Sequence, residues 1–133
     1  MNSLKIQIPS LPENIRIVES FIDNVKDQFK IDDDIYGNIM VAVTESVNNA
    51  IRHGNNLDKN KNVFLSVFAE ETQLKFTIED EGPGFNPDHL PDPTAPENLD
   101  KLGGRGIFLM KHLSDEVSFS KEGRCVELTF YFN

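Results

Sequence analysis

Two polar side chains, Glu45 and Asn49, stand four residues apart in a segment with helical apolar spacing. Residues at this spacing project from one face of a helix, so both side chains would line one groove. A carboxylate and an amide placed this way can orient a nucleophile and donate an oxygen ligand to Mg²⁺. The spacing alone is more typical of a solvated polar pair. A functional interpretation therefore depends on the other candidate runs in the sequence.

A second candidate is the run Asp80-Glu81-Gly82-Pro83-Gly84-Phe85, which directly follows a strand-like segment. Glycines let the main chain adopt conformations that other residues avoid and approach a ligand closely. Asp80 at the strand end can accept a hydrogen bond from an exocyclic amine, and Phe85 is expected to anchor the loop in the core. A D-x-G-x-G run by itself also occurs in ordinary tight turns.

A third candidate is the run Gly103-Gly104-Arg105-Gly106-Ile107, placed just before a short helical pattern. Backbone N–H groups at a helix N-terminus bind phosphate oxygens, and the helix dipole favours negative charge there. The Arg105 guanidinium adds a fork suited to phosphate. Glycines here could also serve only as the hinge of a flexible loop. The phosphate-binding interpretation therefore depends on this run following the other two in order.

Hydrophobic periodicity predicts the elements that must position these residues. Alternating apolar residues predict strands over residues 4–8, 63–68, 74–78, 117–119 and 126–132. Apolar spacing of three and four predicts helices over 12–30 and 35–53, and a short helix beginning close to Gly106. Asp32-Asp33-Asp34 is expected to cap the second helix and to favour its dipole. This order predicts an α/β two-layer sandwich, with helices on one face of a mixed, mostly antiparallel sheet.

Composition narrows the class of protein. With 133 residues, 38% of them apolar, the chain fits one domain over 1–133, and the Pro- and Gly-rich stretch predicts a lid at about 86–103. A net charge of −9 argues against a nucleic-acid binder. No apolar run is long enough to cross a bilayer and the N-terminus has no signal-peptide pattern, so a cytoplasmic protein is expected. The single cysteine, Cys125, fits a reducing compartment and a buried strand position.

Taken in order, the three runs resemble the nucleotide-binding boxes of the GHKL superfamily, which contains gyrase, heat-shock chaperone, histidine kinase and mismatch-repair ATPases. The E-x-x-x-N-A-x-x-H-G run from Glu45 to Gly54 is similar to the N box. Asp80-x-Gly82-x-Gly84 resembles the first glycine box, and Gly104-x-Gly106 with its helix resembles the second. The resemblance covers essentially the whole chain and implies the Bergerat ATP-binding fold. The branch most similar is that of the anti-sigma factor serine kinases of bacterial sporulation and stress control.

The resemblance implies a role for each matching residue. Asn49 corresponds to the Mg²⁺ ligand, Glu45 to the general base and Asp80 to the adenine-recognising carboxylate. The other implied cofactor-binding positions are Gly82, Gly84 and Phe85 on the adenine side and Gly103, Gly104, Arg105, Gly106 and Ile107 at the phosphates. His53 matches the N-box histidine. For this residue, a structural role at the helix end is at least as well supported as a contact with the ligand. Arg124 stands where the family often has a threonine, which leaves water-mediated adenine recognition open.

The function implied is that of an ATP- and Mg²⁺-dependent serine/threonine kinase that phosphorylates an anti-anti-sigma factor and binds a sigma factor. The same resemblance implies a homodimer, and neither nucleic acid nor a membrane is an expected partner. A nucleotide-gated binding module without phosphotransfer is an alternative from another class. A detached histidine kinase catalytic domain is disfavoured because no phospho-accepting helix hairpin precedes the domain. A nucleotide-binding relic is disfavoured by the presence of Glu45.

Overall fold

Residues 2–83 and 104–132 are described by a computed structural model, with the side chains of residues 104 and 105 left outside the description. The predicted lid at 86–103 and three of the predicted site residues, Gly84, Phe85 and Gly103, lie outside these ranges. Within the described ranges, no helix has the length and apolar character that crossing a membrane requires.

The strands form one sheet in the order β1-β2-β3-β5-β4, and each of its four pairings is antiparallel. Side chains alternate between the two faces along each strand, so Leu65 of β2 and Ile78 of β3 stand opposite each other on the buried face. The strands predicted from apolar alternation are all present: the first four each gain one residue at either end, and the last is shifted by one residue toward the N-terminus. Their bounds are Ser3–Pro9 for β1, Asn62–Ala69 for β2, Gln73–Glu79 for β3, Glu116–Ser120 for β4 and Cys125–Tyr131 for β5.

The predicted helices are present with different ends. The first begins as a 3-10 turn at Pro12–Asn14 and continues as α1, Ile15–Phe29. The second is α2, Asp33–Asn49, and its last predicted residues instead form a wider π-helical turn, Ala50–Gly54. The third, α3, spans Gly104–Leu113 and therefore begins two residues before Gly106.

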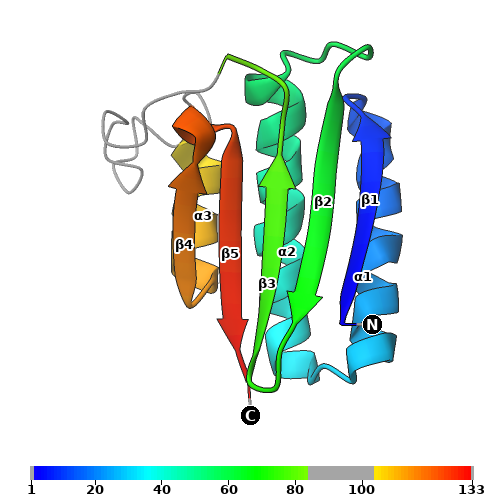
Figure 1. Cartoon of the computed structure of the whole chain (residues 1–133), viewed down its shortest axis with the longest axis vertical. Helices are drawn as coiled ribbons and strands as arrows, with labels where there is room; N and C mark the ends of the chain where they lie inside the picture. The colour runs from blue at the N-terminus through cyan, green and yellow to red at the C-terminus, as the bar shows by residue number, and fades with distance from the viewer. Residues whose placement is uncertain (1, 84–103, 133) are drawn as a thin grey trace.

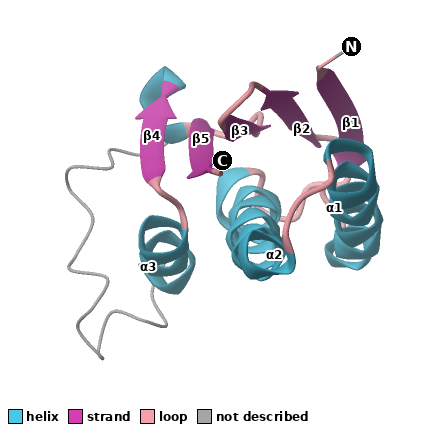
Figure 2. Cartoon of the chain, turned by 90° about the horizontal axis from the view of Figure 1, so that it is seen from below, coloured by secondary structure: helices cyan, strands magenta, loops and turns pink. Residues whose placement is uncertain are grey.

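The helices lie in one layer on a single face of the sheet, with α2 between α1 and α3 (Figure 2). The core fills the space between the layers, where Phe76 and Phe130 meet edge to face with ring centroids 5.9 Å apart. From the helix layer, Ile22 and Ile39 are fully buried against the same core. The predicted two-layer sandwich is thus confirmed, and Cys125 is buried in β5 as expected.

The start of α2 corrects one detail of the prediction. Asp32 holds the N-cap position with an extended backbone, but its side chain makes no capping hydrogen bond. Asp33 and Asp34 occupy the first turn, where they favour the helix dipole. Asp33 also pairs with Lys26 of α1 at 2.8 Å, so part of this acidic cluster ties two helices together instead of capping one.

Candidate functional site

The ends of several elements gather at one end of the molecule, the upper end in Figure 1. The carboxyl ends of α2 and β3, the start of α3 and the connection from β4 to β5 all lie there (Figure 1). Each of the three predicted runs includes one of these ends or directly follows it. The fold therefore brings together segments that are far apart along the chain.

Asn49 of α2 lies against Gly106 of α3. A Cβ atom built on Gly106 would stand 2.5 Å from Asn49 Nδ2 and 3.0 Å from its Oδ1. Such a separation is below van der Waals contact, so a larger residue at position 106 would require the Asn49 amide to move. The contact places the first turn of α3, whose backbone N–H groups have no partner within the helix, beside the predicted Mg²⁺ ligand.

Asp80 is enclosed by two glycines from different segments. Its carboxylate accepts a hydrogen bond from the Gly82 N–H at 2.8 Å. A Cβ on Gly54 would lie 2.4 Å from Asp80 Oδ2, and a Cβ on Gly82 would lie 1.8 Å from the Gly54 carbonyl oxygen. The end of the N-box run and the first glycine run are therefore in direct backbone contact, with the carboxylate between them.

Burial raises the pKa of the Asp80 carboxyl above its ordinary value of 3.8. The Gly82 N–H and the positive charge of Arg124 act in the opposite direction and partly offset this effect. Only 9% of Asp80 is exposed, so the carboxylate has few water partners. A carboxylate in this setting is stabilised by a ligand group that donates hydrogen bonds to it, such as an exocyclic amine.

Asn55, which directly follows Gly54, is not among the predicted site residues. Its side chain donates to Ser10 Oγ at 2.8 Å and to the Asn62 carbonyl at 3.0 Å, and it accepts from the Glu81 N–H at 2.8 Å. Glu81 in turn accepts from the Asn62 N–H at 2.8 Å. The only local signal was an amide residue just after the helix-ending glycine.

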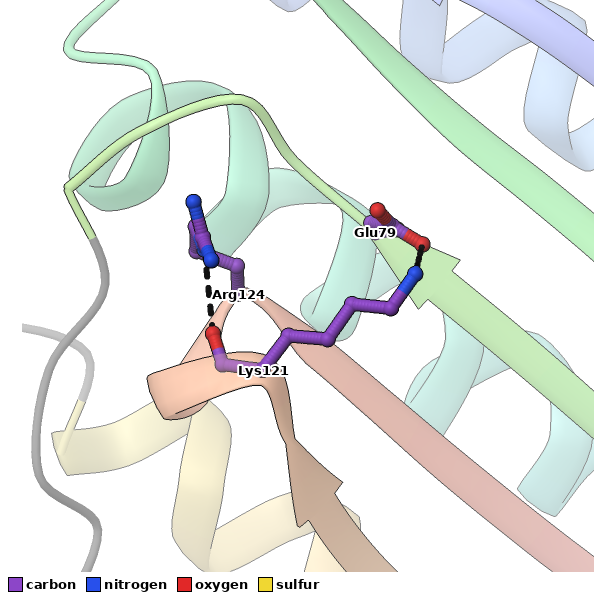
Figure 3. Close-up of polar contacts among 3 residues, drawn as sticks. All are labelled: Glu79, Lys121 and Arg124. Carbon is purple, nitrogen blue, oxygen red and sulfur yellow. Dashed lines mark hydrogen bonds and ion pairs between the residues drawn. The ribbon is translucent and has the colours of Figure 1, made fainter.

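A second polar link joins β3 to the β4–β5 connection, as Figure 3 shows. Lys121 Nζ reaches Glu79 Oε1 at 3.0 Å, and the Arg124 Nε–H donates to the Lys121 carbonyl at 3.0 Å. The Asp80 N–H donates to the Arg124 carbonyl at 2.9 Å. Arg124, which departs from the family pattern, is thus bonded through its backbone to the residue predicted to read adenine.

The remaining predicted residues are placed as follows. Glu45 is partly exposed on α2, one turn before Asn49. Gly104 and Arg105 belong to the first turn of α3, while the Ile107 side chain is 4% exposed and packs in the core. Any contact of Ile107 with a ligand would therefore involve its backbone. His53 lies in the π-helical turn and is largely exposed. Its pKa is lowered, mainly by the burial of part of the side chain and to a smaller extent by the positive charge of Arg52.

The donor groups suit a nucleotide with its cation. The described residues contain no cluster of three His, Cys, Asp or Glu side chains that could hold a metal ion unaided. Mg²⁺ is commonly bound through one or two protein oxygens, with phosphate oxygens and water completing its shell. The Asn49 amide oxygen beside the start of α3 fits this pattern, because phosphates at that helix end would supply the missing ligands.

The sequence pattern of the histidine kinase-like ATPase domain matches residues 8–130. The chain belongs to this family of ATPase domains. Among curated proteins, it is similar to serine-protein kinase RsbW of Bacillus velezensis, with 32% identity over 98% of this chain and 86% of the relative. It is also similar to serine-protein kinase RsbW of Bacillus subtilis, with 29% identity over the same shares of the two chains.

A solved structure agrees with the fold. The crystal structure of RsbU and RsbW domains from Mycobacterium tuberculosis superposes with a TM-score of 0.67 and 15% identity. The match covers 100% of this chain and 32% of that one. At this identity the likeness concerns the fold, and it agrees with the five-stranded sheet and one-sided helix layer described above.

Proposed function

We propose that this chain is an ATP- and Mg²⁺-dependent serine-protein kinase that phosphorylates an anti-anti-sigma factor and binds a sigma factor. The observation that carries the proposal is a pair of close contacts made by glycines at one end of the fold. Gly106 meets Asn49, and Gly82 meets Gly54 around the Asp80 carboxylate. Similarity over nearly the full chain to proteins named serine-protein kinases supports the same reaction.

Each residue has a chemical task in this proposal. Asp80 accepts a hydrogen bond from the amine of adenine, and Asn49 holds Mg²⁺ through its amide oxygen. The cation, when bound, neutralises charge on the phosphate oxygens. The N–H groups of the first turn of α3 and the Arg105 guanidinium bind the phosphates. Glu45 takes the proton of the attacking serine hydroxyl.

Phosphate transfer tests the proposal directly. The parent chain is incubated with radiolabelled ATP, Mg²⁺ and a candidate anti-anti-sigma protein from the same genome, and mass spectrometry locates the added phosphate. Glu45→Gln keeps the shape of the side chain but removes the base. Its transfer rate is therefore expected to fall by about 10²–10⁴, while its ATP affinity by calorimetry stays near that of the parent.

Glu71→Gln is the matched control, because Glu71 is exposed in the turn between β2 and β3, at the other end of the molecule (Figure 1). It should transfer phosphate at the parent rate. A parent chain that binds ATP but transfers no phosphate would contradict the kinase assignment. Equal transfer by Glu45→Gln and the parent would contradict only the role of Glu45. A pull-down of sigma factor with ATP, with ADP and without nucleotide tests the second activity.

The homodimer and the cytoplasmic location stay predictions. Sedimentation of the parent chain with and without nucleotide would measure the first.

A further inference from the structure

Asn55 is a buried polar side chain whose hydrogen-bonding groups are used on both sides of the amide. Only 1% of the residue is exposed. Its Nδ2 donates twice, to Ser10 Oγ and to the Asn62 carbonyl, and its Oδ1 accepts from the Glu81 N–H. Removing this amide is costly, because it is itself buried and its partner Ser10 Oγ then loses a hydrogen bond away from water.

The partners of Asn55 belong to segments that are distant along the chain. Ser10 follows β1, Asn62 begins β2, and Glu81 follows β3. Ser10 Oγ also donates to the Lys61 carbonyl at 2.7 Å, which extends the network to the segment before β2. The amide therefore ties three strand ends to the end of α2.

The same residue also fixes the backbone on both sides of Asp80. Its own N–H donates to the Ala50 carbonyl at 2.8 Å and closes the π-helical turn, which ends at Gly54. Gly54 is the residue whose carbonyl meets Gly82. On the other side, the Asn55 amide holds Glu81, the residue between Asp80 and Gly82. One residue thus positions Gly54 through its backbone and the Asp80–Gly82 segment through its side chain.

We propose that Asn55 is a positioning residue for base recognition: its amide holds the Glu81 backbone so that the Asp80 carboxylate faces the base. This inference rests on the proposed function, since it assumes that the base of a nucleotide meets Asp80. Among the described residues, the hydrogen bonds of the Asn55 side chain go to Ser10, Asn62 and Glu81 and not to Asp80 itself. Asn55 acts through Glu81 and Gly54.

Ser10→Ala separates positioning from stability. It removes one hydrogen bond to the Asn55 amide and the side-chain bond to Lys61, but it leaves the bond between Asn55 and Glu81 intact. Ser10 is fully buried, so its loss should lower the melting temperature as a buried hydrogen-bond deletion does. It should leave nucleotide recognition unchanged.

Asn55→Ala removes the link to Glu81 as well. We expect its dissociation constant for ATP to rise roughly tenfold, as the loss of one intramolecular hydrogen bond would give. The ratio of ATP to GTP affinity should fall toward one, because Asp80 no longer has a fixed orientation. In the transfer assay, KM for ATP should rise while kcat at saturation stays near that of the parent, since base contacts are made equally in ground and transition states. If Asn55→Ala does not fold, Asn55→Ser is measured in its place, because its hydroxyl is one bond shorter and does not reach Glu81.

The outcomes separate this inference from the proposed function. If the alanine variants of Asn55 and Ser10 show the same ATP affinity and the same preference over GTP, Asn55 is a structural residue only and the inference is overturned. If the parent chain binds no nucleotide, the proposed function fails. Hydrogen exchange of the Glu81 amide then decides the role of Asn55, since the protection should be lost in Asn55→Ala and kept in Ser10→Ala. Protection retained in Asn55→Ala would overturn it.

Discussion

The two ends of α2 are both polar, but they are built in different ways. At its start, Lys26 pairs with Asp33 and lies over the Tyr36 ring, 4.9 Å from the ring centroid, and the Tyr36 hydroxyl donates to Asp23. These are contacts between side chains at the surface, and 89% of the Asp33 side chain is exposed. At the end of α2, Asn55 and Asp80 are buried residues, and their polar contacts involve backbone groups.

The glycines show the same difference. A Cβ on Gly37, near the start of α2, would meet no atom within 4 Å. A Cβ on Gly54 or Gly82 would overlap neighbouring atoms. A surface cluster can lose one member and let water replace it, whereas a set of backbones in contact has no room to adjust. The start of α2 therefore supports the fold, and its end fixes the geometry of the candidate site.

The largest effect is expected from Gly82→Ala. The new methyl group would need the space of the Gly54 carbonyl, and backbone on both sides prevents an easy shift. We expect a loss of about 1–3 kcal/mol in the free energy of unfolding and a loss of ATP binding, measured by denaturant unfolding and calorimetry. Gly37→Ala is the matched control. Since it adds a methyl group to an open helix position, it should stabilise by about 0.5–1 kcal/mol. Destabilisation of equal size by both would remove the contrast between the two ends.

Asp80→Asn should have its main effect on ligand affinity. The amide cannot accept the amine of adenine as strongly as a carboxylate, so we expect ATP to bind roughly 10–100 times more weakly. ATP affinity by calorimetry that matches the parent would show that Asp80 does not read the base.

The same variant tests the electrostatics of the site. Because burial raises the pKa of Asp80, the folded state holds this proton more tightly than the unfolded chain does. The parent chain therefore loses stability as pH rises from 3.8 through the raised pKa. Asp80→Asn does not ionise, so its melting temperature relative to the parent should rise from acidic to neutral pH. A difference independent of pH would contradict the raised pKa.

The smallest effect is expected from Lys26→Ala. The ion pair with Asp33 is exposed and its attraction is screened by water and salt. The melting temperature should change little, and the remaining difference should shrink further in 1 M salt. ATP affinity should stay that of the parent. Weaker ATP binding would show that the start of α2 also shapes the site.

The sequence predicted what depends on local pattern. Apolar alternation located every strand of the described residues, and helical spacing located α1 and α2, because one face of each element must be buried. The order of the three runs also led to residues that the fold brings together, such as Asn49 and Gly106. Their roles toward a ligand stay predictions, as do those of Glu45, Asp80 and Arg105.

What the sequence did not reveal depends on distant partners. The Asn55 side chain forms hydrogen bonds with residues 45 positions before it and 26 positions after it. Nothing in the neighbouring sequence therefore indicates that it is buried with several hydrogen-bond partners. The π-helical turn after Asn49 has the same origin, since its end is held by Asn55 and by the contact of Gly54 with Gly82. Asp32 had the residue type of a cap, yet local preference did not decide where its side chain lies.

The contact between Gly54 and Gly82 joins a helix to a hairpin that follows it in the chain. The arrangement of Gly54 and Gly82 around Asp80 therefore forms only after β2 and β3 have docked on α2, and a partly folded chain does not contain it. A nucleotide held there binds the finished fold alone and stabilises it by mass action. The cell's supply of ATP would then help to decide how long each copy of the protein survives proteolysis.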